Sequence, residues 1–154
     1  AAQFAIENEV HINFTTIEPF PLEMEVIKQL NYASSIGQDD LNNVFEELHT
    51  SKWEEKVEIN PYFSIHKINT KLEDFQTNEK FDVLFFDAFA PSKQAELWTA
   101  DLMQKCFNLL KVGGVFTTYS AKGQLKRDLK SVGFEVETLP GPPGKKEMVR
   151  GVVN

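Results

Sequence analysis

The sequence contains a single cysteine, Cys106, among 154 residues. It can therefore form no internal disulfide bond, and it offers no site in which several cysteines bind one metal ion. The three histidines show no metal-ligand spacing, so we expect no metal. No stretch resembles a signal peptide or a transmembrane helix. These absences predict a protein of a reducing, cytoplasmic compartment without membrane association.

Three familiar motifs are also absent from the sequence. The chain has no glycine-rich G-x-G loop, no P-loop and no G-x-S-x-G nucleophile turn. Basic residues are fewer than acidic residues, with 16 Lys and Arg against 23 Asp and Glu, and the formal net charge is −7. This balance argues against a general nucleic-acid coat protein, although it leaves room for a local basic patch.

The composition that remains is that of an ordinary globular protein, with 42% apolar and 25% charged residues. Thirteen phenylalanines predict a core rich in aromatic rings. The length suits one domain, which we predict over residues 1–154. The first nine residues have the pattern of a helix that begins earlier, so we expect the domain to be incomplete at its N-terminus.

Strand and helix patterns alternate along the chain. The predicted strands cover residues 11–18, 81–87, 115–120, 134–139 and 147–153, and residues 56–69 are predicted to form a hairpin or two short strands around Asn60-Pro61. The predicted helices fall at 22–30, from 39 or 40 to 48, at 70–75, from a Thr99 cap to a stop at Gly113 and Gly114, and from a Ser120 cap to Gly133. This order predicts an α/β fold with a largely parallel sheet, and the short link between the last two strands predicts a final antiparallel hairpin.

Ligands of open α/β sheets bind beyond the carboxyl ends of the strands, where this sequence places Glu18, Asp87 and Ser120. Residues 81–86 are strongly apolar and predict a buried strand that presents Asp87. Asp87 is either a turn cap that accepts from the following backbone N–H groups or a ligand-binding carboxylate. Glu18 is either an exposed turn residue before Pro19 or an acceptor for the hydroxyls of a ribose.

Four further residues are candidates for the site. Trp98 is favoured as a packing residue over a platform for stacking a base. Lys93 is expected to be solvated. Lys145 and Lys146 lie in a loop rich in glycine and proline, and they are either solvated or placed to hold a phosphate backbone.

Two long blocks carry a family resemblance. They are FFDAFAPSKQAELW at residues 85–98 and LLKVGGVFTTYSAKGQLKRDLKSVGFEVETLPGPPGKKEM at residues 109–148. Both resemble the methyltransferase domain of the tRNA 5-methylaminomethyl-2-thiouridine biosynthesis protein, and FTTIEPFPL at residues 14–22 resembles the second strand of that domain.

This resemblance implies a class I methyltransferase that uses S-adenosylmethionine. Its fold is a Rossmann-like sheet, mostly parallel, with an antiparallel strand near the C-terminus. The reaction implied is methylation of the primary amine of 5-aminomethyl-(2-thio)uridine at the wobble position of tRNA. tRNA is then the expected substrate and partner, and a separate flavin-dependent oxidoreductase that makes the amine is a second expected partner.

The same resemblance implies roles for seven residues. Glu18 would hold the ribose of S-adenosylmethionine, while Asp87 would contact the cofactor and face the reacting amine as the catalytic residue. The implied substrate-binding residues are Phe89, Pro91, Lys93, Lys145 and Lys146.

The sequence departs from the family pattern at three places. A first strand with its glycine-rich cofactor loop is missing, Gln-Ala stands before Glu96 where the family has Asn-Pro, and Asn69 lies near a position that is often acidic. Two alternatives therefore stay open. A small-molecule or protein N-methyltransferase fits the acidic charge, and a non-catalytic methyltransferase-like scaffold fits the missing loop.

Overall fold

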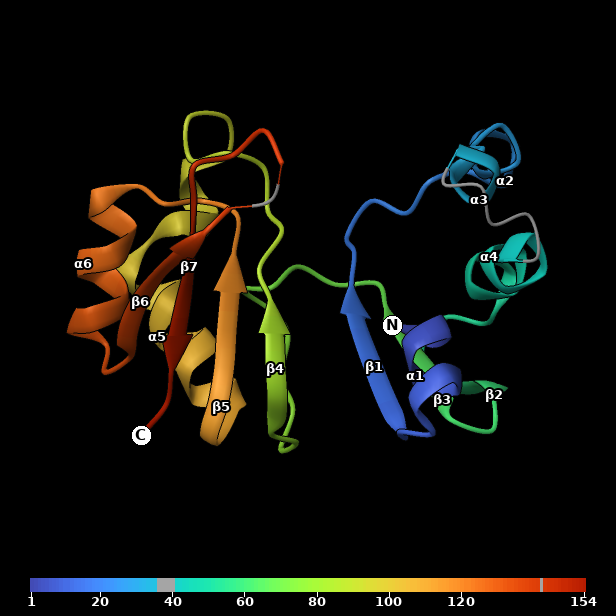
Figure 1. Ribbon diagram of the computed structural model, residues 1–154, viewed down its shortest axis with the longest axis horizontal. Coiled ribbons are helices and arrows are strands. Elements are labelled where there is room, and N and C mark those ends of the chain that lie inside the picture. The colour runs from blue at the N-terminus through green and yellow to red at the C-terminus, as the bar shows by residue number, and fades with distance from the viewer. Residues whose placement is uncertain (36–40, 142) are drawn as a thin grey trace. The chain divides into compact units, whose positions relative to one another are not determined.

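The computed structural model describes residues 1–35, 41–141 and 143–154. The chain divides into two compact units, Ala1–Phe75 and Gln76–Asn154 (Figure 1). The prediction of one domain over residues 1–154 stays a prediction. Among the residues that the structure describes, no helix has the length and apolar character needed to cross a membrane.

The first unit contains a three-stranded sheet in the order β1-β3-β2. Strand β1 (Ile12–Ile17) pairs in parallel with β3 (Phe63–Ile68), and β2 (Lys56–Asn60) pairs with β3 as an antiparallel hairpin. The predicted strands at 11–18 and 56–69 are thus confirmed. The helices are α1 (Ala2–Asn8), α2 (Met24–Ile27), α3 (Tyr32–Ser35) and α4 (Asn42–Thr50). The expected start of a helix at residue 39 or 40 lies outside the described residues.

The core of the first unit lies between α1 and the sheet. Ala2 and Ala5 of α1 pack with Phe63 and Ile65 of β3, and all four side chains are buried. Small alanine side chains allow the helix to approach the strand closely. The amphipathic face predicted for α4 is half-buried at Val44 and Leu48 and joins the rim of this core.

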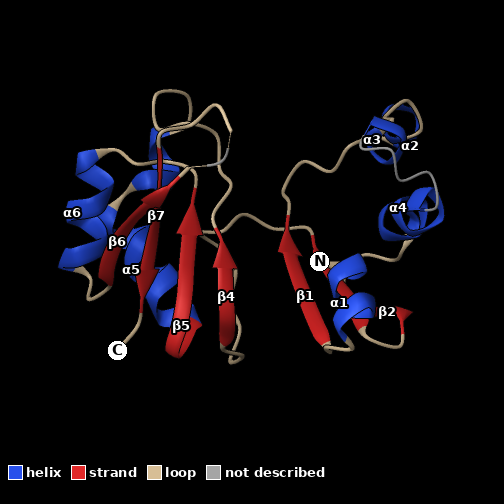
Figure 2. Ribbon diagram, in the orientation of Figure 1, coloured by secondary structure: helices blue, strands red, loops and turns tan. Residues whose placement is uncertain are grey.

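The second unit contains a four-stranded sheet in the order β4-β5-β7-β6 (Figure 2). Strand β4 (Phe81–Phe85) pairs in parallel with β5 (Leu110–Thr118). Strand β7 (Glu147–Val152) is antiparallel to both β5 and β6 (Glu135–Pro140), which confirms the predicted antiparallel hairpin. The helical segments are η2 (Ala95–Trp98), α5 (Ala100–Leu109) and α6 (Gly123–Ser131). Helix α5 begins as predicted, because the Thr99 side chain accepts from the backbone N–H of Leu102 at 3.4 Å.

The core of the second unit is deeper than that of the first. Five side chains there have essentially no exposure: Met103, Cys106, Phe116, Leu129 and Val149. Cys106 is therefore a core residue, as its place on the apolar face of the helix predicted. Burial raises the pKa of its thiol to about 12, so the thiol stays protonated and unreactive in the folded protein.

Strand β4 corrects one prediction. Residues 81–86 were expected to form a buried strand, but Val83 is 46% exposed and Phe85 is 68% exposed. Strand β4 is the outer strand of its sheet, and its side chains alternate between two faces. Leu84 is paired with Phe116 on the covered face, whereas Val83 and Phe85 point to the other face. An apolar run thus indicates a strand without fixing which of its faces is covered.

Several predicted element ends also need correction. Gly113 and Gly114 do not end α5, which stops at Leu109, but lie within β5, where Gly113 adopts a positive φ of 79°. Ser120 is not the cap of α6, because Lys122 occupies that position. The helix predicted at 22–30 is a single turn, α2, and residues 72–74 form a turn instead of a helix. The differences around Leu109 and Lys122 concern element ends, whereas at residues 22–30 and 70–75 most or all of the predicted helix is absent.

Candidate active site

Asp87 follows directly after the last paired residue of β4. Backbone pairing with β5 continues to Phe86, whose N–H donates to the carbonyl of Thr117 at 2.9 Å. The Asp87 side chain is exposed, and within the described part of the chain its carboxylate makes no hydrogen bond or ion pair. The bonds to following N–H groups that define a turn cap are therefore not formed. Asp87 stands at the end of the strand with all its acceptor capacity available.

The turn after Asp87 is held in place by two aromatic side chains. Trp98 donates from Nε1 to the carbonyl of Phe89, and Tyr119 donates from its hydroxyl to the carbonyl of Ala88, both at 2.8 Å. Trp98 is buried and meets the ring of Phe86 edge-on at 5.0 Å. The prediction that Trp98 is a packing residue is confirmed, and its indole nitrogen also supports the turn.

The predicted substrate-binding residues of this turn differ in exposure. Phe89 is 75% exposed, Pro91 is half-buried and Lys93 is exposed. The backbone N–H of Lys93 closes the turn onto the carbonyl of Ala90 at 2.7 Å. The turn therefore offers one free aromatic face beside Asp87, which is the kind of surface on which a flat base stacks.

Tyr119 is a site residue that sequence reasoning missed. The parallel pairing of Phe85 with Thr117 puts Asp87 and Tyr119, each two residues further on, at the same edge of the sheet. Burial raises the pKa of the Tyr119 phenol, and the negative charge of Asp87 raises it further. Tyrosine is neutral at physiological pH, and both effects favour this neutral form, in which the Tyr119 hydroxyl donates to Ala88. The sequence places Tyr119 at the end of a predicted strand, but that strand was expected to end at Ser120, two residues beyond the observed end of β5 at Thr118.

The two lysines of the loop before β7 are placed differently. The ammonium of Lys145 lies over the Tyr119 ring, 3.8 Å from its centroid. Lys146 is exposed and has no side-chain partner among the described residues. Lys145 therefore belongs to the same cluster as Tyr119 and the Asp87 turn, while Lys146 faces solvent.

In the first unit, Glu18 occupies the corresponding position after β1. Its N–H donates to the carbonyl of Ile68 at 3.1 Å, and one carboxylate oxygen accepts from the N–H of Phe20 at 2.7 Å. Asn69 joins it, donating from its side chain to the Glu18 carbonyl at 2.9 Å and from its N–H to Glu54 at 2.7 Å. Glu18 is therefore a turn residue as well as a candidate ligand, because a carboxylate can accept several hydrogen bonds.

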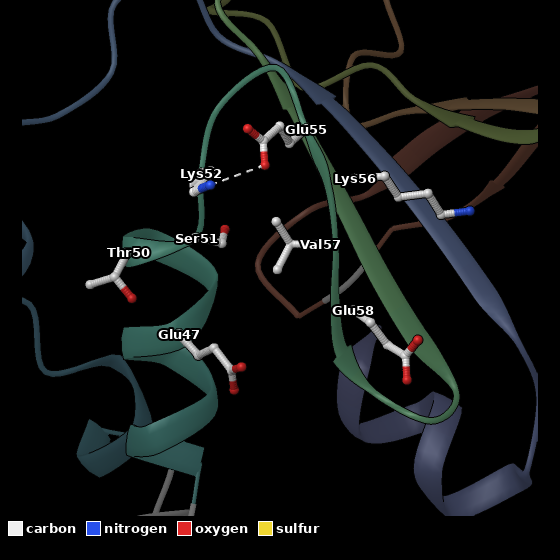
Figure 3. A pocket seen from close by; sticks show the side chains of 8 residues that line it. All are labelled: Glu47, Thr50, Ser51, Lys52, Glu55, Lys56, Val57 and Glu58. Atoms are coloured by element: carbon white, nitrogen blue, oxygen red, sulfur yellow. Dashed lines mark ion pairs between the residues drawn. The ribbon is translucent and has the colours of Figure 1, made fainter.

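A hollow of about 500 Å³ lies elsewhere in the first unit, between the end of α4 and β2 (Figure 3). Glu47 and Glu58 face it from these two elements, and an ion pair joins Lys52 to Glu55 at 3.4 Å. None of the strand-end residues lines it. The described ranges also contain no group of three or more His, Cys, Asp or Glu side chains that could hold a metal ion.

The family of this chain follows from its sequence profile. The profile of a family described as S-adenosyl-L-methionine-dependent methyltransferase matches residues 30–154. The chain belongs to this methyltransferase family. S-adenosylmethionine is therefore the cofactor of its class, and the Rossmann-like class I fold predicted from the sequence is confirmed.

Curated relatives carry a more specific name. The chain is similar to the tRNA 5-methylaminomethyl-2-thiouridine biosynthesis bifunctional protein MnmC of Campylobacter hominis, with 28% identity over all of this chain and 23% of that protein. It is also similar to the protein of the same name from Pseudoalteromonas atlantica, with 38% identity over 56% of this chain and 12% of that protein. The chain thus spans less than a quarter of the length of these relatives.

A solved structure supports the fold. MNMC2 from Aquifex aeolicus superimposes with a TM-score of 0.70 over 98% of this chain and 47% of that protein, at 19% identity. A methyltransferase from Pyrococcus furiosus superimposes with a TM-score of 0.54 over 99% of this chain and 69% of that protein, at 18% identity. These two likenesses concern the arrangement of the backbone alone.

Proposed function

We propose that this chain carries the methyl-transfer site of an enzyme that methylates the primary amine of 5-aminomethyl-(2-thio)uridine at the wobble position of tRNA. The observation that carries the proposal is Asp87, an exposed carboxylate without a hydrogen-bond partner in the described residues, at the end of β4 beside the exposed ring of Phe89. The name shared by the two curated relatives gives the substrate class.

Methyl transfer to this amine requires a residue that binds the protonated amine and assists the loss of its proton. An alkylamine has a pKa of about 10.4, so it arrives as an ammonium and must lose a proton before its lone pair can form the new N–C bond. When bound, S-adenosylmethionine supplies a methyl group on a positively charged sulfur. Asp87 accepts a hydrogen bond from the ammonium, orients the nitrogen and provides a path for the proton to solvent. Phe89 and Pro91 form the surface on which the uracil ring rests.

The residues after β1 fit the nucleoside part of the cofactor. A ribose presents two neighbouring hydroxyl donors, and the Glu18 carboxylate has acceptor capacity beyond its bond to the N–H of Phe20. Asn69 lies at the same strand ends, and its side-chain amide is held by the Glu18 carbonyl. In this proposal Glu18 holds the ribose, and Asn69 fixes the backbone that carries it.

The charge of the second unit suits an RNA substrate. Residues 76–154 carry eleven Lys and Arg against nine Asp and Glu, a formal net charge of +2 within a chain of −7. Lys93, Lys145 and Lys146 all lie in the two turns at the Asp87 edge of the sheet.

We further propose a cytoplasmic location and a separate flavin-dependent oxidoreductase that supplies the amine.

The test is methyl transfer by the intact protein. Transfer from labelled S-adenosylmethionine is measured with tRNA that carries the free 5-aminomethyl group, and with the same tRNA after the amine has been acetylated. We expect label in the first tRNA alone. Transfer to small amines or to protein in place of tRNA would support the alternative N-methyltransferases, and cofactor binding without transfer to any acceptor would support the scaffold.

A further inference from the structure

We propose that Tyr119 is a positioning residue that fastens the Asp87 turn to the Lys145 loop, so that the two segments that meet the substrate form one rigid unit. The inference rests on the proposed function for the identity of the substrate. It adds a residue to the site and separates the two lysines into different roles.

The first step is the bond from Tyr119 to the turn. Its hydroxyl donates to the carbonyl of Ala88 at 2.8 Å, and Ala88 is the residue next to Asp87. Together with the bond from Trp98 to Phe89, it fixes two consecutive carbonyls of the turn. The rings of Tyr119 and Trp98 meet edge-on, with centroids 6.3 Å apart and planes at 82°. The backbone that carries Asp87 is therefore held by two side chains that also pack against each other.

The second step is the contact between Tyr119 and the loop before β7. The Lys145 ammonium lies 3.8 Å from the ring centroid, within the range of a cation–π interaction. Tyr119 thus binds the turn with its hydroxyl and the loop with its face. Residues 88, 119 and 145 are distant along the chain, and the Tyr119 side chain brings their three segments into contact.

The third step concerns the charges around Tyr119. Asp87 and Lys145 are the charged groups that act on it, one through its negative charge and one through its ring. A tyrosine hydroxyl is protonated at neutral pH, as a donor to Ala88 must be, and the raised pKa of this phenol extends that range towards alkaline pH. Lys145 is therefore held beside the site by the ring, whereas Lys146 is left to meet a phosphate.

The experiment uses Tyr119→Phe in the intact protein, because it removes the hydroxyl and keeps the ring that binds Lys145. We expect faster amide hydrogen exchange at residues 88–90 and 92–94, and a fall in kcat of about tenfold, the scale of one lost hydrogen bond. The KM values for tRNA and for S-adenosylmethionine should stay unchanged. Tyr62→Phe is the matched control, since Tyr62 lies in the first unit and its hydroxyl has no partner among the described residues.

Lys145→Met and Lys146→Met give the second comparison. Lys145→Met should speed exchange in the loop at residues 144–146 and lower kcat, while Lys146→Met should raise the KM for tRNA and leave exchange in the Asp87 turn unchanged. If Tyr119→Phe does not fold, Lys145→Met carries the test alone. Unchanged exchange at residues 88–90 and 92–94 in Tyr119→Phe, or equal effects of the two lysine variants, would overturn the inference.

The two hypotheses fail in different ways. If the wild-type protein transfers no methyl group to tRNA, the proposed function is wrong, but the exchange rates of the turn still decide whether Tyr119 fastens it. If the wild type is active and Tyr119→Phe keeps full kcat, the proposed function stands and the positioning role is wrong.

Discussion

The two units of this chain differ most in their charge. Residues 1–75 contain five lysines, no arginine and fourteen Asp and Glu, a formal net charge of −9, whereas residues 76–154 carry +2. The overall value of −7 hides this division. The acidic average argued against a general nucleic-acid coat protein but left room for a local basic patch, and the unit that holds Asp87 is indeed the basic one. Net charge should therefore be judged on the part of the molecule that meets the ligand.

The strand-end carboxylates of the two units, Glu18 and Asp87, differ in whether they hold their own turn. Glu18 uses one oxygen to hold its own turn, through the N–H of Phe20. Asp87 has no such bond in the described residues, and Tyr119 and Trp98 hold its turn instead. A side chain that makes no hydrogen bond within the protein can be replaced with little effect on the free energy of unfolding. The comparison thus predicts separable effects on stability, transfer and cofactor affinity.

The largest effect is expected in the core of the second unit. Phe116 has no exposure, and its ring lies 5.5 Å from those of Phe86 and Phe134. Phe116→Ala should lower the free energy of unfolding by about 3–5 kcal/mol because it leaves a cavity. Phe14→Ala in the first unit should cost less, since Phe14 is already half-exposed. Urea denaturation measures both, and an equal loss would contradict the difference in core depth.

The next effect is on catalysis. Asp87→Asn keeps the size of the side chain and removes its charge, so methyl transfer should fall by about 100-fold or more if Asp87 orients the amine. The free energy of unfolding should change little, because the carboxylate supports no other group in the described residues. The affinity for S-adenosylmethionine should also change little if Glu18 provides the main hydrogen bonds to the ribose.

Asp82→Asn is the matched control for Asp87→Asn. It lies five residues earlier in β4, and its carboxylate pairs with the exposed Lys111 at 2.8 Å. Such surface pairs contribute little, so turnover should stay near wild type. Normal turnover in Asp87→Asn would end its catalytic assignment.

A smaller effect should separate the units by charge. Lys146→Glu should weaken tRNA binding and reduce the slope of log affinity against log salt by about 0.9, because one lysine no longer neutralises a phosphate. Lys28→Glu makes the same change in net charge in the first unit, where Lys28 is exposed, and it should leave the slope unchanged. Affinities measured between low and physiological salt decide this. Equal slopes in both variants would mean that the lysine loop does not touch phosphate.

The sequence predicted the features that depend on neighbouring residues. The Thr99 cap of α5 needs only the N–H of Leu102, and the hairpin of β6 and β7 needs only two short strands and a turn. Trp98 and Cys106 were correctly assigned to the core because their positions fall on an apolar face. Local patterns were sufficient for these elements.

Features that depend on the assembled sheet were not predictable in the same way. The exposure of Phe85 follows from the outer place of β4 in its sheet, which the apolar run does not encode. The role of Tyr119 arises from contacts with residues 31 and 26 positions away along the chain. The predicted strand ended at Ser120, two residues beyond the end of β5 at Thr118, and this error moved attention to Ser120 and away from Tyr119.

The smallest effect is expected at Glu18, where structure and ligand share one carboxylate. Glu18→Gln keeps an oxygen that can accept from Phe20, so the turn should persist and the free energy of unfolding should stay near wild type. The negative charge is removed, and bonds to charged acceptors are about twice as strong as neutral ones, so affinity for S-adenosylmethionine should fall by roughly fivefold. Calorimetric titration of the intact protein measures this affinity.

The control for Glu18→Gln is Glu25→Gln, an exposed change in the neighbouring helix α2 with the same loss of charge. Its affinity should match the wild type, which separates a ribose contact from a general effect of the acidic unit. At saturating cofactor, Glu18→Gln should recover nearly full kcat, whereas Asp87→Asn should not. An unchanged affinity in Glu18→Gln would leave Glu18 as a turn residue only. Of the two strand-end carboxylates, Glu18 would then have a structural role and Asp87 a role in the reaction.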